Sequence, residues 1–515
     1  MLLCAIIFLS VQTFGQQAYW VFFKDKCVVD FNSETYFTKK AAERRIRNNL
    51  PAYDFRDLPV CDRYISAVGE IVDSLGYSTR WLNGIAVYAN NSQIELVHRL
   101  KFVTKTIPVQ SYEQALASEV TEIDESFSEE LLKKQTERMG ILKMQQQELD
   151  GKGVVIAIFD AGFPMVNTSK AFEHIRNRNG ILATYDFVKK REDVYGYNLH
   201  GTSVLSCIGG KHKGIPIGFA TGAEFLLART ENAHREPFSE EQNWLKAVEW
   251  ADRLGADIIN SSLAYTHNRY FNNQMDGTSS LVAKAANIAA AKGMLVVSAA
   301  GNDGDKQWKY IGTPGDADSA LTVGGVDPNT DYHIDFSSFG PSSDKRMKPN
   351  VSAFGEVSVQ GKTGLTISQG TSFSSPLVAG FAACMLQNDQ SLTAMDLFCQ
   401  IEQSGHLYPY FDYAHGYGIP QATRVLEHRD GDINPTFQIE KGKIMLSVKL
   451  NNDSISTEDI IYYHVENLEG YLDRYFVLSV DEDYPIRLSL DEFKTGQTLR
   501  IHYKGYTASH KFRDE

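Results

Sequence analysis

The feature that most constrains the fold is a continuous run of β-branched and apolar residues, Val154-Val155-Ile156-Ala157-Ile158-Phe159. Such a run is typical of a strand that is covered on both faces. It opens a region in which predicted helices (239–255, 279–292) alternate with predicted strands (256–260, 294–298, 320–323). Repeated units of this kind predict an α/β fold with a parallel sheet, helices on both of its faces, and a ligand site beyond the carboxyl ends of the strands.

The flanks of this region follow other patterns. Residues 18–110 alternate strand, helix, strand, helix, strand, which predicts a small α+β unit. Six acidic residues between 119 and 130 have little to bury, so they predict an exposed linker and a cleavage zone. After residue 429, segments of period-two alternation between turn residues predict a small antiparallel β domain.

Composition removes several classes of function. With 43% hydrophobic and 22% charged residues, the chain is neither mainly disordered nor fibrous nor a multi-span membrane protein. A net charge of −13 makes nucleic acid an unexpected partner. The six cysteines contain no CxxC pair, which excludes a zinc or redox motif of that type; Cys207 and Cys384 lie in apolar helical stretches and are predicted to be buried and inert. Cys27 and Cys61 could pair, and the sequence leaves that question open.

The N-terminus has the pattern of an export signal. Residues 2–11 form an apolar run of ten, and Thr13-Phe14-Gly15 fits a signal-peptidase site with small outer residues. The run is too short to span a bilayer. The alternative is a buried strand that begins the first domain, which the absence of Lys or Arg before the run favours. We expect a signal peptide over residues 1–16.

Three segments carry side chains that could act together in catalysis. Asp160 follows the strand at 154–159, His200 precedes an apolar helical run, and Ser372 lies at the predicted start of another helix. Taken singly, each has a plain structural explanation as a turn aspartate, a structural histidine or a capping serine. Together they supply a nucleophile, a general base and a carboxylate that fixes the tautomer of the base.

A fourth segment could stabilise the charge that this nucleophile would create. The strand at 294–298 ends in Ala299-Ala300-Gly301-Asn302, which presents a side-chain amide at the same edge of the sheet. An amide donates to an oxyanion without competing as a base. The backbone N–H of Ser372, assisted by the helix dipole, is the expected second donor. The plain alternative for Asn302 is a turn residue.

The four local contexts, in chain order FDAGF, HGTSV, SAAGN and GTSFSSP, resemble those of the subtilisin-like serine peptidases. Asn260-Ser261-Ser262-Leu263, Lys348-Pro349-Asn350-Val351 and Gly416-Tyr417-Gly418 are similar to further motifs of that family, so the resemblance covers about residues 135–428. It implies a serine endopeptidase with Asp160 as the orienting carboxylate, His200 as the base and then the acid, Ser372 as the nucleophile and Asn302 as the oxyanion donor. It also implies substrate binding by Ser262, Leu263, Ala264, Ala300 and Gly301.

Three departures from the family pattern are visible. The usual Asp-Thr/Ser-Gly is Asp160-Ala161-Gly162 here, which removes a hydroxyl beside the catalytic carboxylate and implies at most a tuning of activity. Ala264 replaces a usual glycine and would narrow the pocket for the residue before the scissile bond. Residues 265–277 resemble an inserted loop, whose Tyr265, Tyr270, Phe271 and Met275 either contact substrate or pack on one another.

The resemblance also gives the flanks a meaning. It implies a signal peptide (1–16), an inhibitory propeptide-like α+β domain (17–118), an acidic linker with a maturation site (119–134), a peptidase domain (135–428) and a C-terminal β domain (429–515) that is either a surface or sorting module or a plain accessory domain. Expected partners are protein or peptide substrates and the chain's own propeptide, with no nucleic acid and no transmembrane span in the mature form. We expect a secreted, periplasmic or cell-surface location and no cofactor for catalysis, with structural calcium possible but not assignable. The rival hypothesis is a catalytically silent domain that serves as a binding or scaffold protein.

Overall fold

The computed structural model describes residues 17–27, 30–109, 120–121, 125–232, 239–266, 269–427, 435–451, 459–480 and 486–513. The predicted signal peptide therefore lies outside the described residues. By contacts, the chain divides into two compact units: residues 1–33 with 53–112, and residues 34–52 with 113–515.

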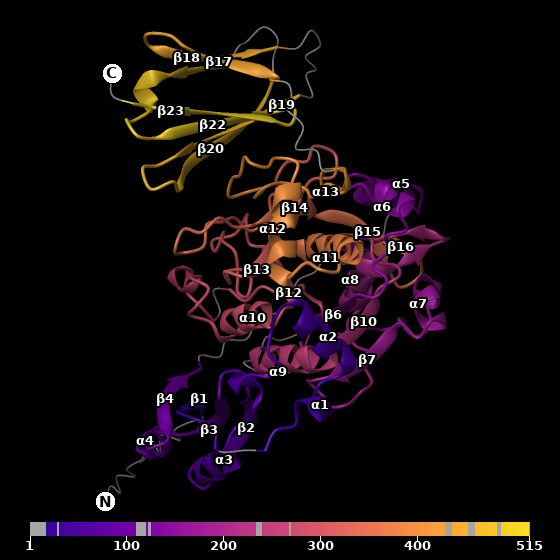
Figure 1. Cartoon of the computed structure of the whole chain (residues 1–515), viewed down its shortest axis with the longest axis vertical. Coiled ribbons are helices and arrows are strands. Elements are labelled where there is room, and N and C mark those ends of the chain that lie inside the picture. The colour runs from indigo at the N-terminus through magenta and orange to yellow at the C-terminus, as the bar shows by residue number, and fades with distance from the viewer. Residues whose placement is uncertain are drawn as a thin grey trace, which may run out of the picture. The chain divides into compact units, whose positions relative to one another are not determined.

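The larger unit is built on a seven-stranded sheet whose paired strands are all parallel (Figure 1). The predicted strand at 154–159 is confirmed as the central strand β6 (Val155–Asp160), which is buried along its whole length. From edge to edge the strands are β14 (Val351–Phe354), β13 (Ala320–Val326), β12 (Leu295–Ala299), β11 (Ile258–Ser261), β6, β10 (Glu224–Arg229) and β7 (Ile181–Asp186). The predicted α/β fold with a parallel sheet is thus confirmed.

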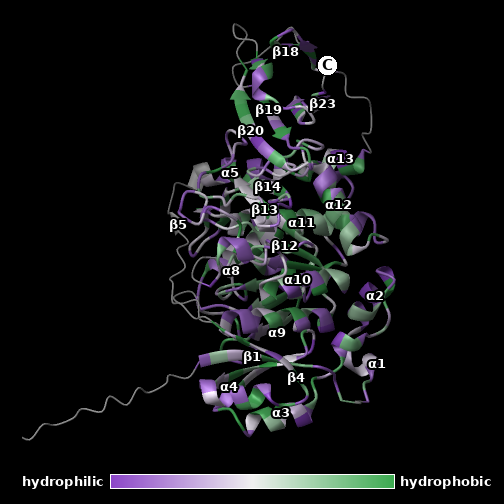
Figure 2. Ribbon diagram, turned by 90° about the vertical axis from the view of Figure 1, so that its left-hand side faces the viewer, coloured by the Kyte–Doolittle hydropathy of each residue, from purple (hydrophilic) through white to green (hydrophobic). Residues whose placement is uncertain are grey.

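Helices cover both faces of this sheet. Helices α8 (His200–Gly209) and α11 (Thr371–Asn388) lie on one side, and α9 (Ser239–Leu254) and α10 (Leu281–Ala291) lie on the other (Figures 1 and 2). Figure 2 shows α11 as largely hydrophobic, because it runs through the core of the unit. A Cβ at Gly380 would lie 3.0 Å from the Ile208 carbonyl oxygen, so glycine lets α11 approach α8 closely. Shorter helices are α6 (Ile141–Gln146), α7 (Glu173–Asn177), α12 (Ala394–Ser404) and α13 (Ala422–Leu426).

The smaller unit confirms the α+β pattern predicted near the N-terminus. Its antiparallel sheet has the order β2 (Ser74–Thr79), β3 (Gly84–Ala89), β1 (Gln17–Phe23) and β4 (Val103–Pro108), with helices α3 (Asp62–Gly69) and α4 (Asn91–His98). Alternate residues of β1 and β3 fill its core together with residues of the helices. Strand β2 escaped the sequence prediction, because it is mostly exposed and carries little apolar alternation.

Residues 17–118, which we expected to form one propeptide-like domain, are divided between the two units. Helices α1 (Ser33–Tyr36) and α2 (Lys39–Arg47) fall in the segment 34–52 that groups with the peptidase region, apart from Ser33 itself. The reason lies in the basic side chains of α2. Their acidic partners, including Asp252 and Asp257, are more than 200 residues away in the chain.

The expected exposed linker at 119–134 is wrong for its second half. Helix α5 (Glu125–Glu137) buries Ser128, Leu131, Leu132 and Gln135, which share one helical face. It packs against the hairpin β15 (Glu356–Gln360) and β16 (Leu365–Gln369), and β16 also pairs with β5 (Val120–Thr121). Glu129 and Glu130 lie away from the buried face of the helix: Glu130 is exposed, and the half-buried Glu129 pairs with Lys213 at 2.9 Å.

The C-terminal region is the small antiparallel β domain that alternation predicted. One sheet has the order β17 (Phe437–Lys441), β18 (Met445–Leu450) and β21 (Ile486–Ser489). The other has the order β20 (Leu472–Ser479), β19 (Ile460–Glu466), β22 (Thr498–Tyr503) and β23 (Tyr506–Lys511). Both sheets contribute to one apolar core, as in a β-sandwich.

Candidate active site

Three neighbouring strands bring the predicted catalytic segments to one edge of the sheet. Phe159 of β6 pairs with Ser261 of β11, and Ser261 pairs with Ser298 of β12. The carboxyl ends of these strands are therefore level. Asp160 ends β6, Ser262 follows β11, and Asn302 follows β12 by three residues. This is the edge at which parallel sheets bind ligands.

Asp160 and His200 form a direct pair. His200, the first residue of α8, faces both carboxylate oxygens of Asp160 through Nδ1, at 2.8 and 3.0 Å. The Asp160 side chain is fully buried, whereas the His200 side chain remains 15% exposed. Burial alone would lower the pKa of His200, but the charge of Asp160 and its hydrogen bond outweigh burial and raise that pKa above its ordinary value. The pair therefore holds Nδ1 and leaves Nε2 as the basic atom.

Ser372 is the second residue of α11, as the sequence predicted. Its N–H has no acceptor within the helix, because the first four N–H groups of a helix lack one. Its hydroxyl donates to the Ser262 carbonyl at 3.2 Å, and among the described residues no hydrogen bond joins it to His200. The ring of the next residue, Phe373, lies 5.3 Å from the His200 ring between centroids, which places the serine beside the base. Catalytic hydrogen bonds are often long in unliganded enzymes and tighten with substrate.

The amide of Asn302 is held in one orientation by Thr371. Its Oδ1 accepts from the Thr371 N–H and from the Thr371 hydroxyl, both at 2.9 Å. Because both partners donate to this atom, the opposite atom is the NH₂ group. A Cβ built on Gly370 would lie 3.3 Å from it, so the donor is beside the turn that precedes the serine. Sequence reasoning missed this role of Thr371, although it stands next to Ser372 in the motif.

The proposed substrate-binding residues differ in what they offer. Ser262 exchanges two hydrogen bonds with Ser372, through its carbonyl and through its hydroxyl, which donates to the Ser372 carbonyl at 3.0 Å. Leu263 is nearly buried and Gly301 is buried. Ala300 is fully buried, and its N–H and carbonyl are bonded to Val323 and Gly312. Its backbone hydrogen bonds are thus made within the fold.

The methyl group of Ala264 occupies the space between two backbone segments. A Cβ built on Gly312 would lie 3.0 Å from it, and one built on Gly301 would lie 3.4 Å from it. Gly301 precedes Asn302 in the chain, and the Gly312 N–H donates to the Ala300 carbonyl in the same segment. The extra methyl therefore fills room that a glycine at 264 would leave open.

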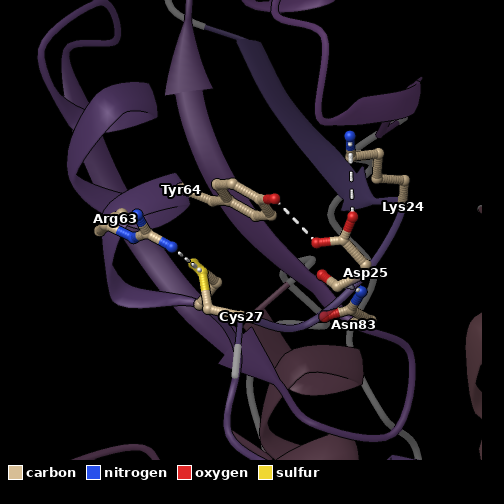
Figure 3. Close-up of a disulfide and its surroundings, with 7 residues drawn as sticks. Lys24, Asp25, Cys27, Arg63, Tyr64 and Asn83 are labelled. Carbon is tan, nitrogen blue, oxygen red and sulfur yellow. Dashed lines mark hydrogen bonds and ion pairs between the residues drawn. A yellow bond between two sulfur atoms is a disulfide. The ribbon is translucent and has the colours of Figure 1, made fainter. Parts of the chain in front are cut away.

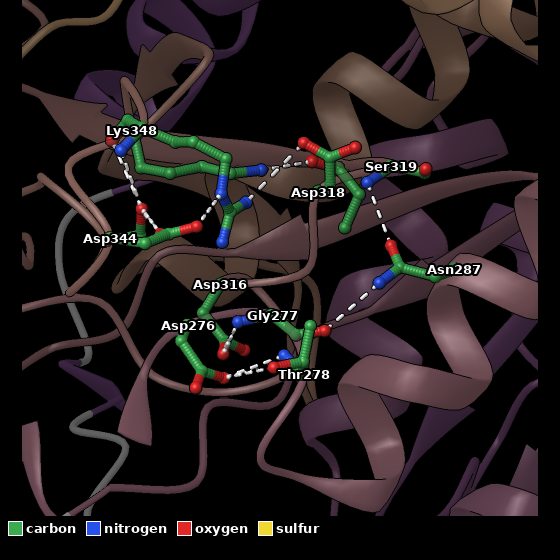
Figure 4. A network of polar contacts seen from close by, with 12 residues as sticks. Asp276, Gly277, Thr278, Asn287, Asp316, Asp318, Ser319, Asp344 and Lys348 are labelled. Carbon is green, nitrogen blue, oxygen red and sulfur yellow. Dashed lines mark hydrogen bonds and ion pairs between the residues drawn. The ribbon is translucent and has the colours of Figure 1, made fainter. Parts of the chain in front are cut away.

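The loop at 265–277 mostly packs on the protein. Tyr265 and Met275 are buried, and the Tyr270 hydroxyl donates to Glu241 at 2.9 Å. Of the four side chains singled out in this loop, Phe271 is the one that is exposed, at 68%. A polar network anchors the end of the loop (Figure 4): Gly277 donates to Asp316 and accepts from Asn287.

Arg229 supports the Asp160 turn, a role that the sequence did not reveal. Its Nε donates to the Ala161 carbonyl at 3.1 Å, and its Nη1 contacts both carboxylate oxygens of Asp186. The guanidinium also stacks on Tyr197, 3.5 Å from the ring centroid. The turn with alanine in place of a hydroxyl residue is thus held through its backbone. Arg229 ends β10 and pairs with Asp160 at the end of β6. Knowledge of the strand order would therefore have placed Arg229 beside Asp160.

Metal-binding groups and thiols are the other candidate sites of chemistry in the described part of the chain. It holds no group of three or more His, Cys, Asp or Glu side chains that could bind a metal ion. Cys207 and Cys384 are buried as predicted, and burial raises the pKa of both thiols. Cys27 and Cys61 form a disulfide, which answers the question that the sequence left open. None of the described helices is long and apolar enough to cross a membrane.

Comparison with family models decides the identity of this site. The subtilase family model matches residues 151–418, which include all four predicted catalytic residues. The chain belongs to the subtilase family. It is a serine endopeptidase with a subtilisin-like catalytic domain, and a model of the S8 peptidase propeptide domain of Bacteroidota matches residues 18–125.

Individual relatives are moderately similar. The chain is 28% identical over 280 residues to serine protease AprX of Bacillus subtilis, covering 48% of this chain and 60% of that protein. It is 29% identical over 254 residues to subtilisin DY of Bacillus licheniformis, covering 49% and 83%. Among solved structures, the MycP3 protease from the type VII (ESX-3) secretion system is 21% identical with a TM-score of 0.46, over 60% of this chain and 92% of that one.

Proposed function

We propose that this subtilase is an exported zymogen that hydrolyses peptide bonds through an acyl-enzyme intermediate. The observation that carries the proposal is the joint placement of four groups at one sheet edge. Asp160 binds Nδ1 of His200, Ser372 begins α11 beside the His200 ring, and Asn302 is oriented by Thr371.

The chemistry follows from these groups. His200 Nε2 takes the hydroxyl proton while Ser372 Oγ bonds to the carbonyl carbon of the substrate. The negative charge on the substrate oxygen is met by the Asn302 amide and the Ser372 N–H. The C–N bond then breaks as the imidazolium gives its proton to the leaving amine. Water repeats the sequence on the acyl-enzyme and frees Ser372, while Asp160 keeps its contact with Nδ1 of His200.

The rival hypothesis is a silent subtilisin-like domain that only binds or scaffolds. Labelling with a fluorophosphonate separates the two, because the reagent needs an activated serine. We expect the processed wild-type protein to be labelled and Ser372→Ala to be unlabelled. Ser368→Ala is the matched control, since Ser368 is a buried serine on the adjacent strand whose hydroxyl has no hydrogen-bond partner among the described residues. Equal labelling of the wild type and Ser372→Ala would contradict the proposed role.

Maturation is proposed to cut the chain between residues 109 and 125. Val109 is still bonded to β1 through Ala18, whereas α5 from Glu125 onward packs into the catalytic domain. If the enzyme processes itself, Ser372→Ala should accumulate as uncleaved precursor. N-terminal sequencing of the wild-type product should place its first residue in that interval. A mature form that begins after α5 would contradict the assignment of this helix to the enzyme.

Export is supported by the disulfide Cys27–Cys61, since disulfides persist in oxidising compartments. We propose a secreted, periplasmic or cell-surface enzyme whose partners are protein or peptide substrates and its own propeptide. Detection of the processed enzyme outside the cytoplasm, with loss of residues 1–16, would test this. An intact N-terminus on cytoplasmic protein would contradict it.

A further inference from the structure

A basic segment of the N-terminal region is embedded in the catalytic unit. Residues 34–52 lie within the propeptide match at 18–125, yet they group with residues 113–515. We call residues 34–52 the clasp. Its helix α2 carries Lys40, Arg44, Arg45 and Arg47, and Figure 1 shows α2 beside α9.

The clasp caps the C-terminal ends of α9 and α10. Thr38 donates its N–H and its hydroxyl to the last carbonyls of α9, at 3.0 and 2.9 Å. Arg44 donates to carbonyls at both helix ends, and the Asn48 amide donates to the carbonyl that follows α10. The last carbonyls of a helix lack N–H partners from the next turn, and cations are favoured at that end. The acceptors are Asp252, Arg253, Leu254, Ala256, Lys292 and Gly293.

Ion pairs bind the clasp where water is excluded. Asp252 accepts from both Arg44 and Arg45, and the side chains of Arg44 and Asp252 are 0% and 2% exposed. Arg47 pairs with Asp257 at 2.5 Å. Removing one partner of a buried ion pair leaves the other charge buried and uncompensated, which is costly. Buried ion pairs of this kind therefore make the docking of the clasp specific.

The clasp lies at the opposite end of the strands from the triad. Its partners precede the strands: Asp257 precedes β11, Gly293 precedes β12, and Glu224, which binds Lys40, begins β10. Asp160 and Asn302 lie at or beyond the carboxyl ends of β6 and β12. The clasp therefore binds without touching the catalytic edge of the sheet.

A disulfide links the chain segments that precede and follow the clasp in the sequence. Cys27 and Cys61 are separated by 34 positions, and residues 34–52 lie between them in the sequence. Figure 3 shows the surroundings of Cys27. The disulfide reduces the number of conformations that the chain between the two cysteines can adopt when the clasp is not bound. This lowers the entropic cost of docking the clasp.

We propose that the clasp keeps the cleaved propeptide bound to the enzyme. The surface that receives this chain's own residues 34–52 is formed by the C-terminal ends of α9 and α10. The inference rests on the proposed zymogen function, because it concerns the chain after cleavage. In this proposal the clasp retains the propeptide at a place distinct from the active site, so retention does not require that the active site be blocked.

The test uses the full chain with Ser372→Ala and a recognition sequence for a site-specific protease inserted between residues 110 and 119. After the added protease has cut the chain, size-exclusion chromatography measures how much N-terminal fragment stays with the C-terminal fragment, and dilution measures its dissociation rate. We expect the fragment to co-elute. Arg44→Gln should raise the dissociation rate at least about 30-fold, from the known cost of breaking a buried charge pair.

Lys39→Gln is the matched control, since Lys39 is on the same helix, is 90% exposed and pairs only weakly with Glu43. It should change the rate by less than about twofold. Asp252→Asn should raise the dissociation rate as Arg44→Gln does. The effect of the double variant on the dissociation free energy should be smaller than the sum of the two single effects. If Arg44→Gln does not fold, Lys40→Gln, which breaks the partly exposed pair with Glu224, should still accelerate dissociation.

The proposal is overturned if the fragment leaves the unsubstituted cut chain at once, or if Lys39→Gln acts as strongly as Arg44→Gln. These results do not depend on the chain's own activity, because an added protease makes the cut. Failure of the wild-type chain to process itself would instead contradict the proposed zymogen function.

Discussion

Replacing Asn302 by alanine removes one of the two groups that we propose as donors to the developing oxyanion. Its Oδ1 is bonded to Thr371 at 2.9 Å twice over, so the NH₂ group is already aimed and needs no reorganisation during the reaction. For an oxyanion-hole asparagine of subtilisin, the loss is about 2.7–4 kcal/mol, or about 10²–10³ in kcat. We expect a fall of that size in kcat for hydrolysis of a chromogenic peptide, with KM nearly unchanged.

The same variant leaves the buried Thr371 N–H without its acceptor, which should lower the free energy of unfolding by about 1–3 kcal/mol. Thermal unfolding therefore has to accompany the kinetics. Thr371→Val, which removes the hydroxyl that orients the amide, should lower kcat less than Asn302→Ala does, and Thr371→Ser should preserve it. A loss in Asn302→Ala confined to KM would refute the assignment.

Three further results are expected. Because the pKa of His200 is raised and the base must be neutral, kcat/KM should increase with pH through a midpoint above about 6.5, and a midpoint below that value would contradict the effect of Asp160. Ala264→Gly should raise kcat/KM for peptides with a large residue before the scissile bond relative to alanine, as measured with a peptide library; an unchanged preference would show that the methyl does not line that pocket. Gln135→Ala, which removes three buried hydrogen bonds between α5 and the catalytic domain, should lower the free energy of unfolding of the mature enzyme by about 1–3 kcal/mol per unsatisfied group, whereas no change in denaturant unfolding would detach α5 from it.

The catalytic framework was predictable because its signals are local. The apolar run at 154–159 fixes a doubly covered strand, and Gly255 ends α9 with a φ of 90°, which favours glycine. Motif residues then sit at strand ends and helix starts, where chain order alone places them on one edge.

What the sequence did not predict depends on distant partners. The basic residues of α2 resemble those of an ordinary solvent-facing helix until Asp252 and Asp257 are placed beside them. Helix α5 was hidden by its acidic composition, because its buried face at 128, 131, 132 and 135 appears only when helical periodicity is tested. The support that Thr371 gives to Asn302 spans 69 residues and leaves no local pattern.

The most direct test of the account is to trap the acyl-enzyme. The mature enzyme is mixed with an activated ester substrate, quenched with acid within the first turnover and digested, and the acylated peptide is identified by mass spectrometry. We predict one acyl group, on Ser372, formed in a burst and strongly diminished in Asn302→Ala. Turnover without an acyl group on Ser372, or an acyl group on another residue, would contradict the proposed mechanism.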